Sequence, residues 1–172
     1  MIVETFISEE YRDSIENFTC TDEPSVEIFL KEYALKYHQN NLAKTRLYFN
    51  ENRELIGYFT LFTDYITVPK SKRNQNQWKL TSVHGKQMYP AIRLHYLGID
   101  EKFRSQGFGK ILLFFAIDIC KDIAEEIGCV FLSIEALNNS VDFYKKFHFK
   151  LLNKQDQYLT NMIFKIDEID SV

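Results

Sequence analysis

The chain has 172 residues, of which 45% are hydrophobic and 15% are aromatic, and its formal net charge is -3. This composition excludes a disordered or collagen-like chain, and the length predicts one domain, residues 1–172, with a substantial buried core. The sequence has neither a long apolar span nor the basic and apolar regions of a signal peptide, so we expect a cytoplasmic protein without a membrane segment.

The first predicted element is a helix that starts at Asp22 and ends near Asn40-Asn41. Asp22 is a typical N-cap residue, and Pro24 suits the first turn of a helix. Apolar side chains then recur at the spacing of one helical face, at Val26, Phe29, Leu30, Tyr33 and Tyr37.

Two strands, Thr45–Phe49 and Leu55–Phe62, are predicted next, and the polar turn 50–53 joins them as an antiparallel hairpin. Residues 65–68 either extend the second strand or form a third. The polar segment Pro69–Gln77 follows as a loop inserted between strands, and a short strand is predicted around Trp78–Val83.

The stretch between Asp64 and Asp100 contains no acidic residue and carries a charge of +6, which leaves -9 for the rest of the chain. Its basic residues are Lys70, Lys72, Arg73, Lys79, Lys86 and Arg93, with His84 and His95 in addition. Such a surface either receives an anionic substrate or is a solvated loop that compensates acidic neighbours.

A strand at Ala91–Ile99 precedes a glycine-containing turn, and a long apolar helix at Ile111–Ile127 follows it. In the turn, Gly107 and Gly109 allow positive φ and a close approach of the backbone to a ligand. The unpaired N–H groups of the first helical turn favour an anion, and Arg104 and Lys110 add positive charge nearby. The segment therefore predicts a pyrophosphate site.

Two common phosphate motifs do not fit this turn. The dinucleotide fingerprint needs a third glycine at position 112, which is Leu, and the P-loop needs Ser or Thr where Ile111 stands. The remaining pattern, Arg-x-x-Gly-x-Gly, is filled by Arg104, Gly107 and Gly109. It resembles the acyl-CoA-binding signature of the GNAT superfamily of N-acetyltransferases.

A second segment carries the same resemblance. A buried strand is predicted at Cys129–Glu135, and a short helix within Leu137–Phe149 leads into another strand. The loop and helix are similar to the family's asparagine loop and its Phe-Tyr-x-Lys-x-Gly-Phe ending, which places Tyr144 on the catalytic tyrosine. His148 stands where the family has Gly, so a left-handed turn is either made there by His or reshaped.

The final strand is predicted at Tyr158–Ile166, before a short acidic tail. The order of elements predicts an α+β fold in which antiparallel strands precede one right-handed crossover, which sets the Ala91 and Cys129 strands parallel. The resemblance implies the GNAT fold, a mixed and mostly antiparallel central sheet with a splayed parallel strand pair and helices on both faces. It also implies that the pantetheine arm of acetyl-CoA lies in that slot and pairs with backbone groups of Tyr96–Ile99.

The resemblance implies acetyl transfer from acetyl-CoA to a primary amine of a small molecule or protein. Tyr144 is then the acid for the leaving thiolate, with packing in the core as its alternative, and a backbone N–H near Gly98 or Ile99 stabilises the developing oxyanion. Glu135 and His95 are candidate general bases, or else a paired surface group and a core histidine. The residues expected to contact the cofactor, with the choice between the two asparagines left open, are Leu97, Gly98, Ile99, Arg104, Ser105, Gln106, Gly107, Phe108, Gly109, Lys110, Asn138, Asn139, Phe143 and Lys146.

Two other functions stay open. Phe18-x-Cys20, a helix stripe that ends at Tyr37, and Leu55–Leu61 are similar to bacterial GNAT toxins of toxin-antitoxin pairs, which acetylate aminoacyl-tRNA. For that function, tRNA phosphates are expected to meet Lys70, Lys72, Arg73 and Lys79. The net charge of -3 argues against it, because such toxins tend to be basic. The other function is a non-catalytic domain that binds acyl-CoA.

The three cysteines, Cys20, Cys120 and Cys129, are isolated in the sequence and lie mostly among apolar residues. We expect buried free thiols, because the chain has neither a Cys-x-x-Cys motif nor the paired His spacing of a metal site. No metal cofactor is therefore expected. The high aromatic content is compatible with a homodimer.

Overall fold

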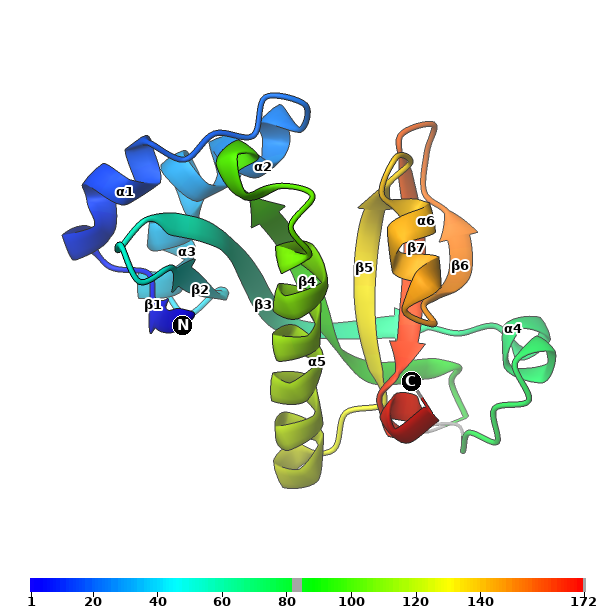
Figure 1. Cartoon of the computed structure of the whole chain (residues 1–172). Helices are drawn as coiled ribbons and strands as arrows, with labels where there is room; N and C mark the ends of the chain where they lie inside the picture. Colours follow the sequence, from blue (N-terminus) through cyan, green and yellow to red (C-terminus); the bar gives the residue numbers. More distant parts are fainter. Residues whose placement is uncertain (82–84, 172) are drawn as a thin grey trace. The chain divides into compact units, whose positions relative to one another are not determined.

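The structure is a computed structural model that describes residues 1–81 and 85–171 (Figure 1). Over these residues it has a seven-stranded mixed sheet with the strand order β1-β2-β3-β4-β5-β7-β6. The chain divides into two compact units, residues 1–62 with 94–116 and residues 63–93 with 117–172. The boundaries fall inside β3, β4 and α5, so each unit holds a part of these three elements.

The first unit begins with antiparallel strands. Strand β1 (Val3–Phe6) pairs with β2 (Lys44–Phe49), and β2 pairs with β3 (Leu55–Thr67). The predicted hairpin is therefore confirmed, and residues 65–67 extend its second strand. The sequence did not predict β1, which is short and mostly exposed and so lacks an alternating pattern.

Helices fill the chain between β1 and β2. A turn η1 (Glu9–Tyr11) leads into the short helix α1 (Arg12–Glu16), which the sequence analysis missed. The predicted helix follows as three consecutive pieces, α2 (Pro24–Ile28), the π-helical turn η2 (Phe29–Ala34) and α3 (Leu35–Gln39). Its N-cap residue is Glu23, so the prediction of Asp22 as the cap is wrong.

The π turn also changes which side chains face the core. Val26, Phe29 and Leu30 are buried as predicted, whereas Tyr33 is 49% exposed. A π turn holds one more residue than an α turn, so the apolar face rotates past the position that a regular helix assigns to Tyr33. The core of this unit is formed by Ile7, Ile15, Phe18, Cys20, Val26, Phe29, Leu30, Ala34, Leu47, Phe49, Leu55 and Tyr58.

The second unit is organised around β5 (Phe131–Leu137), β6 (Lys150–Lys154) and β7 (Leu159–Lys165). Strand β7 lies between the other two and is antiparallel to both. The first residues of β4 (Met88–Ile99) lie beside β5, because Val130 N donates to Pro90 O at 3.0 Å and Ser133 Oγ donates to Ile92 O at 3.4 Å. From the first bond to the second, the residue numbers increase in both strands, which confirms the predicted parallel pair.

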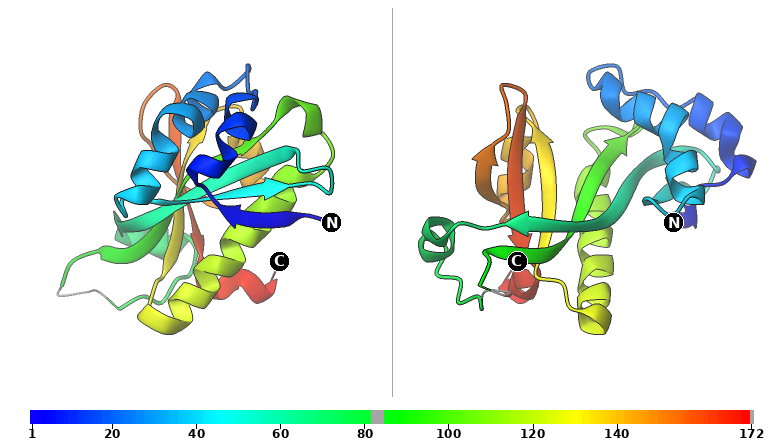
Figure 2. Two further views of the ribbon diagram at one scale, coloured as in Figure 1. Left: turned by 90° about the vertical axis from the view of Figure 1, so that its left-hand side faces the viewer. Right: turned by 180° about the vertical axis from the view of Figure 1, so that it is seen from behind.

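Two helices follow the strands of this crossover. Helix α5 (Phe108–Ile127) begins three residues before the predicted start, and α6 (Val141–Lys146) is the predicted short helix. The opposite views in Figures 1 and 2 both set α6 against one face of β5, β7 and β6. The ring of Phe149, just after α6, lies 5.4 Å from that of Phe164 on this face.

The opposite face of the second unit carries its own apolar cluster, which includes Trp78, Tyr89 and Phe131. The inserted segment contains a short helix, α4 (Lys70–Gln75), where a loop was predicted. Residues 78–81 are not a strand, and Val83 and His84 lie outside the described residues. Trp78 is buried against Phe131, with 5.2 Å between the ring centroids, and its Nε1 donates to the Glu168 carboxylate at 2.6 Å. The acidic tail forms a 3-10 helix, η4 (Ile166–Ser171).

Candidate functional site

The glycine turn lies between β4 and α5 in the first unit. A 3-10 turn, η3 (Glu101–Phe103), follows the strand, and the Asp100 carboxylate caps it by accepting from Lys102 N at 2.9 Å. Ser105 and Gly107 then take left-handed φ values of 58° and 86°. A Cβ on Gly107 meets no atom within 4 Å, so glycine is favoured there by its conformation and not by lack of space.

The start of α5 presents backbone donors at the end of this turn. The helix begins at Phe108, and an early helical bond joins Ile111 N to Gly107 O at 3.3 Å. The amides of Phe108, Gly109 and Lys110 precede this bond, and the first N–H groups of a helix have no partner within it. Gly109 therefore lies in the helix and not in the loop that the sequence predicted. In the first turn of the helix, its amide can still meet an anion.

The Arg104 side chain turns to the N-terminal part of the same unit. Its guanidinium forms an ion pair with Asp22, donates to Cys20 Sγ at 3.0 Å, and donates from Nε to Ile99 O at 3.3 Å. The ion pair lowers the pKa of the Asp22 carboxyl and raises that of Arg104. Burial raises the pKa of the Cys20 thiol to about 11, although Arg104 opposes that shift.

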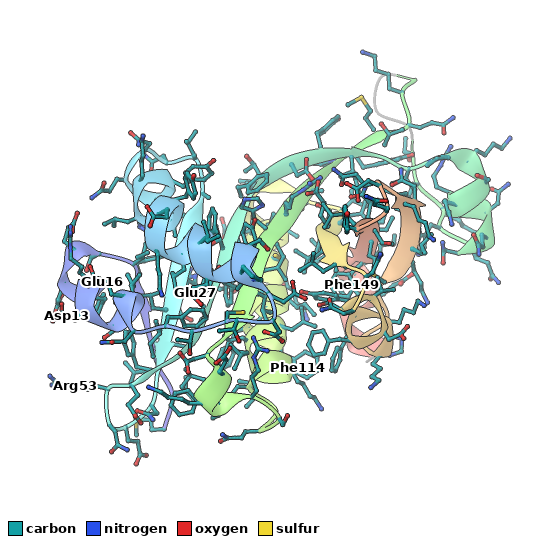
Figure 3. All side chains as sticks on the ribbon, turned by 90° about the horizontal axis from the view of Figure 1, so that it is seen from above. Asp13, Glu16, Glu27, Arg53, Phe114 and Phe149 are labelled. Atoms are coloured by element: carbon teal, nitrogen blue, oxygen red, sulfur yellow. The ribbon has the colours of Figure 1, made fainter. Side chains whose placement is uncertain are left out.

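Backbone bonds fasten the same N-terminal segment to the turn. Thr19 N donates to the Asp100 carboxylate at 2.9 Å, Glu101 N donates to Thr19 O at 3.1 Å, and Thr21 N donates to the Glu101 carboxylate at 2.6 Å. Glu27, which Figure 3 labels on α2, accepts from Cys20 N at 2.8 Å. We call residues 19–22 the strap, and sequence analysis missed its role because its partners lie about 80 positions away.

Gly98 of β4 is set by packing in the first unit. A Cβ there comes within 2.5 Å of Val26 Cγ1 and 2.9 Å of Tyr58 Cε1. The Tyr58 hydroxyl donates to Val26 O at 2.6 Å and fixes this contact. Glycine is therefore required at position 98 for the close approach of α2 and β3, while Leu97 and Ile99 on either side are half-buried.

His95, one of the two candidate bases, lies in an aromatic cluster of the first unit. Its ring centroid lies 5.0 Å from Phe29, 5.2 Å from Phe62 and 4.5 Å from Tyr96. Tyr96 also stacks on Phe29 at 4.5 Å. His95 and Tyr96 therefore both contact the Phe29 ring.

Tyr144 lies on α6 in the second unit and is 9% exposed. Its ring meets Phe143 at 5.1 Å and Phe149 at 5.5 Å, and burial raises the pKa of its phenol. The helix closes through His148, which takes a left-handed φ of 66° while its N–H donates to Lys145 O at 3.1 Å. His148 therefore makes the turn for which the family uses glycine.

The two asparagines before α6 differ in their contacts. Asn138 is tied to the β6–β7 connection, because its N–H donates to Tyr158 O at 3.1 Å and its Nδ2 donates to Gln157 O at 2.6 Å. The Asn139 side chain is exposed, and its Oδ1 accepts from Ser140 Oγ at 3.2 Å. Both side chains are exposed, and that of Asn138 is tied to the β6–β7 connection.

The other predicted contact residues are mostly at the surface. Ser105, Gln106, Lys110 and Lys146 are exposed, and the Lys110 ammonium lies 5.4 Å from the centroid of the Phe114 ring. Phe108 is half-buried against Phe103, and Phe143 is half-buried beside Phe147. Figure 3 labels Phe114 on α5.

Glu135, the other candidate base, is part of an ion-pair network in the second unit. It pairs with Arg93, and Arg93 also pairs with Asp64 at 2.9 Å. Sequence analysis missed Asp64, and it counted Arg93 in the basic stretch without giving it a partner. A signal was present, since Arg93 is a lone charge between the buried residues Ile92 and Leu94.

The basic stretch is less uniform than its sequence suggests. Lys70, Lys79 and Lys86 are exposed, whereas Arg73 is half-buried and donates from Nη1 to Leu80 O at 3.4 Å. Arg93 is neutralised by its two carboxylates. The exposed lysines of and beside α4 are thus the part of this stretch that can meet an anion.

The cysteines are free thiols, with Cys20 and Cys120 buried and Cys129 half-buried. In the part of the chain that the structure describes, no group of three His, Cys, Asp or Glu side chains is placed to hold a metal ion. No helix within the described ranges has both the length and the apolar character needed to cross a membrane.

Comparisons with solved structures identify similar folds over the whole chain. A variant of KacT with a tyrosine replaced by phenylalanine is 22% identical and has a TM-score of 0.80, covering 99% of this chain and 98% of its own. AtaT complexed with acetyl-methionyl-tRNAfMet gives the same values. A tyrosine-to-phenylalanine variant of the AtaT toxin, bound to acetyl-CoA and the C-terminus of the antitoxin AtaR, is 20% identical, with a TM-score of 0.75 and 99% and 97% covered.

A sequence comparison connects the glycine turn and the Tyr144 helix in one family. The model of the Acetyltransferase (GNAT) family matches residues 7–149, which include the strap, the turn and α6. This match spans most of the chain and confirms the resemblance that Arg104, Gly107, Gly109 and Tyr144 indicated. The chain belongs to the GNAT family of acetyltransferases.

Proposed function

We propose that the chain is an acetyl-CoA-dependent N-acetyltransferase that transfers an acetyl group to a primary amine. The observation that carries this proposal is the glycine turn, where Ser105 and Gly107 lead the backbone into the first turn of α5. The amides of Phe108–Lys110 suit the diphosphate of acetyl-CoA, because helix N-termini favour anions. Family membership and the acetyl-CoA bound by the AtaT variant support the same assignment.

The remaining cofactor contacts follow from the family pattern and the side chains available. Backbone groups of Leu97–Ile99 suit the amides of the pantetheine arm. Asn138 and Asn139, both exposed in the loop before α6, are the two asparagine candidates. Phe143 and Lys146 on α6 offer an apolar surface and a positive charge for the rest of the cofactor.

Each chemical task then has a candidate group. Acetyl-CoA, when bound, supplies the activated thioester. A backbone N–H near Gly98 or Ile99 stabilises the oxygen that becomes negative, and the Tyr144 phenol gives a proton to the leaving thiolate. Burial raises the pKa of Tyr144, so the phenol holds its proton at neutral pH and into the alkaline range. Since Glu135 is paired and His95 is enclosed by rings, water is the simplest acceptor for the amine's proton.

Two measurements test this function. Acetyl-CoA at about 100 times its Kd is expected to stabilise the fold by ~2.7 kcal/mol, seen as a rise in Tm. With a panel of primary amines, a thiol-reactive dye is expected to report release of CoA. If acetyl-CoA stabilises the fold but no CoA is released, the chain is a non-catalytic acyl-CoA-binding domain. If neither effect is observed, both functions are excluded.

Aminoacyl-tRNA is the second candidate acceptor. AtaT carries acetyl-methionyl-tRNAfMet, and its fold matches this chain over 99% of the length, including the N-terminal half that shapes the acceptor side in this family. Lys70, the first residue of α4, and Lys79, which follows the helix, are exposed and suit phosphate contacts. Growth arrest on expression, relieved by Tyr144→Phe, together with acetylation of methionyl-tRNA in vitro, would support this acceptor. Normal growth and an unmodified tRNA would exclude it.

A further inference from the structure

One row of polar side chains crosses the sheet of the second unit from β3 to β6. Asp64 lies on β3, Arg93 on β4 and Glu135 on β5, and Asn161 on β7 and Asn153 on β6 continue the row. The register pairs Glu135 directly with Asn161, and Asn161 with Asn153. Directly opposed residues of antiparallel strands project from the same face, so these side chains form one surface.

The Asp64 carboxylate anchors one end of this row. Its Oδ2 accepts from Arg93 Nε at 2.9 Å and from Ser133 Oγ at 2.9 Å, and its Oδ1 accepts from Tyr65 N at 2.8 Å. Arg93 is thereby held in a fixed orientation and reaches Glu135 with Nη1. The Arg93, Asp64 and Glu135 side chains are 20%, 17% and 29% exposed, so Glu135 is the most open of these three.

The two asparagines fix the other end. Asn161 Nδ2 donates to Asn153 Oδ1 at 2.7 Å, which turns the Asn161 carbonyl oxygen away from Asn153. The Asn161 carbonyl oxygen takes no part in this bond, and Glu135 is the residue directly opposite Asn161 on β5. A carboxylate and a carbonyl oxygen on directly opposed residues can both accept from one ammonium group, because Cβ atoms of such pairs are about 5 Å apart.

This row and Tyr144 belong to opposite faces of β5. Tyr144 packs on Phe149, and Phe149 packs on Phe164, whose strand partner is Leu132. Leu132 and Glu135 are an odd number of residues apart, so their side chains leave the strand on opposite sides. An acyl donor beside Tyr144 and an amine on the row would approach the same strand from its two faces.

The charges of the row limit what can bind. Two carboxylates share one guanidinium, so the surface keeps a net charge of -1. An ammonium is attracted to it, whereas a carboxylate next to that ammonium is repelled by Glu135 and Asp64. A free amino acid is therefore a poor ligand, and an amino acid whose carboxyl group is joined as an ester or amide is a good one.

We propose that the row of Asp64, Arg93, Glu135, Asn161 and Asn153 is the acceptor site, in which Glu135 and Asn161 bind the primary ammonium and select amines without an adjacent carboxylate. This inference rests on the proposed acetyltransferase function and specifies its acceptor. Asp64, Arg93 and Asn153 are positioning residues that orient the two binding groups. Carboxyl-blocked amino acids occur both as aminoacyl esters of tRNA and as the N-termini of peptides.

The test compares alaninamide, propylamine and alanine as acceptors for the full chain with acetyl-CoA. The wild type is expected to turn over the first two with a kcat/KM at least ten times that for alanine. Glu135→Gln is expected to raise KM for alaninamide about tenfold and to reduce the discrimination against alanine, while the Tm shift by acetyl-CoA is unchanged. Glu125→Gln, an exposed glutamate on α5, is the matched control. Asn161→Leu is expected to raise KM in the same way.

The outcomes separate this inference from the function on which it rests. A wild type that acetylates alanine as fast as alaninamide, or a Glu135→Gln variant with wild-type KM and selectivity, overturns the acceptor site but leaves the acetyltransferase. If acetyl-CoA does not stabilise the chain and the chain acetylates none of the amines, both the acceptor site and the acetyltransferase function are overturned. Methionyl-tRNA and the peptide Met-Ala-Ser then show which source of blocked amino acid the site prefers.

Discussion

The glycine turn and the Tyr144 helix carry the two halves of the family signature, yet the protein holds them in different ways. Tyr144 is fixed by its own neighbours, since its contacts are Phe143, Phe149 and the backbone of Ser140. The glycine turn is fixed by the strap, which is about 80 residues away in sequence. A local motif is thus sufficient for the Tyr144 helix, whereas the glycine turn depends on a distant segment.

The largest expected effect removes the Tyr144 hydroxyl. Tyr144→Phe keeps the ring contacts with Phe149 and is expected to lower kcat about 10²–10⁴-fold, because a positioned acid contributes that much. The Kd for acetyl-CoA, measured by thermal shift, is expected to change little. Tyr158→Phe, at a 65% exposed position, is the control and should keep the wild-type kcat.

The same residue gives a pH dependence. Burial raises the Tyr144 pKa, so the phenol keeps its proton at a pH where an exposed tyrosine has begun to ionise. The acid is therefore expected to stay functional between about pH 8 and pH 10, and kcat should show no fall from tyrosine ionisation in this range. A decline of kcat with a midpoint near 9 that Tyr144→Phe abolishes would contradict the buried acid.

In the first unit, a large effect on stability is expected at Gly98. Gly98→Ala places a methyl group 2.5 Å from Val26 Cγ1 and 2.9 Å from Tyr58 Cε1, so either these side chains or the strand have to shift. Overpacking of this kind costs about 1–3 kcal/mol. Urea denaturation measures the loss, and a variant within 0.5 kcal/mol of the wild type would show that α2 and β3 are more loosely packed than described.

Gly107→Ala sharpens the comparison because the new methyl group meets no neighbouring atom. The expected cost is about 1–2 kcal/mol, from a left-handed φ of 86° alone. Gly107→Asn should cost less, since Asn tolerates this conformation better. Equal losses for Ala and Asn, measured by urea denaturation, would mean that space and not conformation limits the position.

Local patterns predicted the elements whose contacts are near in sequence. The β2–β3 hairpin, the strand before the glycine turn, α5 and α6 were all predicted from alternation, helical spacing and turn residues. The family motifs added Tyr144 and the glycine turn. The parallel pairing of β4 with β5 followed from the crossover rule, because the intervening chain forms one long helix.

Other features depend on tertiary contacts that no local pattern contains. Asp22 has the sequence of an N-cap, but Arg104 competes for its carboxylate and Glu23 takes the cap position. Tyr33 fits the helical stripe, but the π turn rotates it outward. Trp78 is buried because it packs on Phe131, although it does not lie in a strand.

The smallest expected effect tests the strap itself. Asp22→Asn removes the ion pair with Arg104, and the expected loss is about 0.2–1 kcal/mol, because the Asp22 side chain is 57% exposed and solvent weakens the pair. The Thr19 and Thr21 backbone bonds remain, so the turn should keep its position and its affinity for acetyl-CoA. Asp118→Asn, an exposed aspartate on α5, is the control.

The loss should also depend on pH with a definite sign. Arg104 lowers the pKa of Asp22 in the fold, so the pair stabilises the protein above the ordinary carboxyl pKa and loses its effect as pH falls through the lowered value. The stability difference between wild type and Asp22→Asn should therefore be full at pH 7 and shrink in acid. If the difference is as large at pH 2 as at pH 7, the strap is held to Arg104 by something other than this charge.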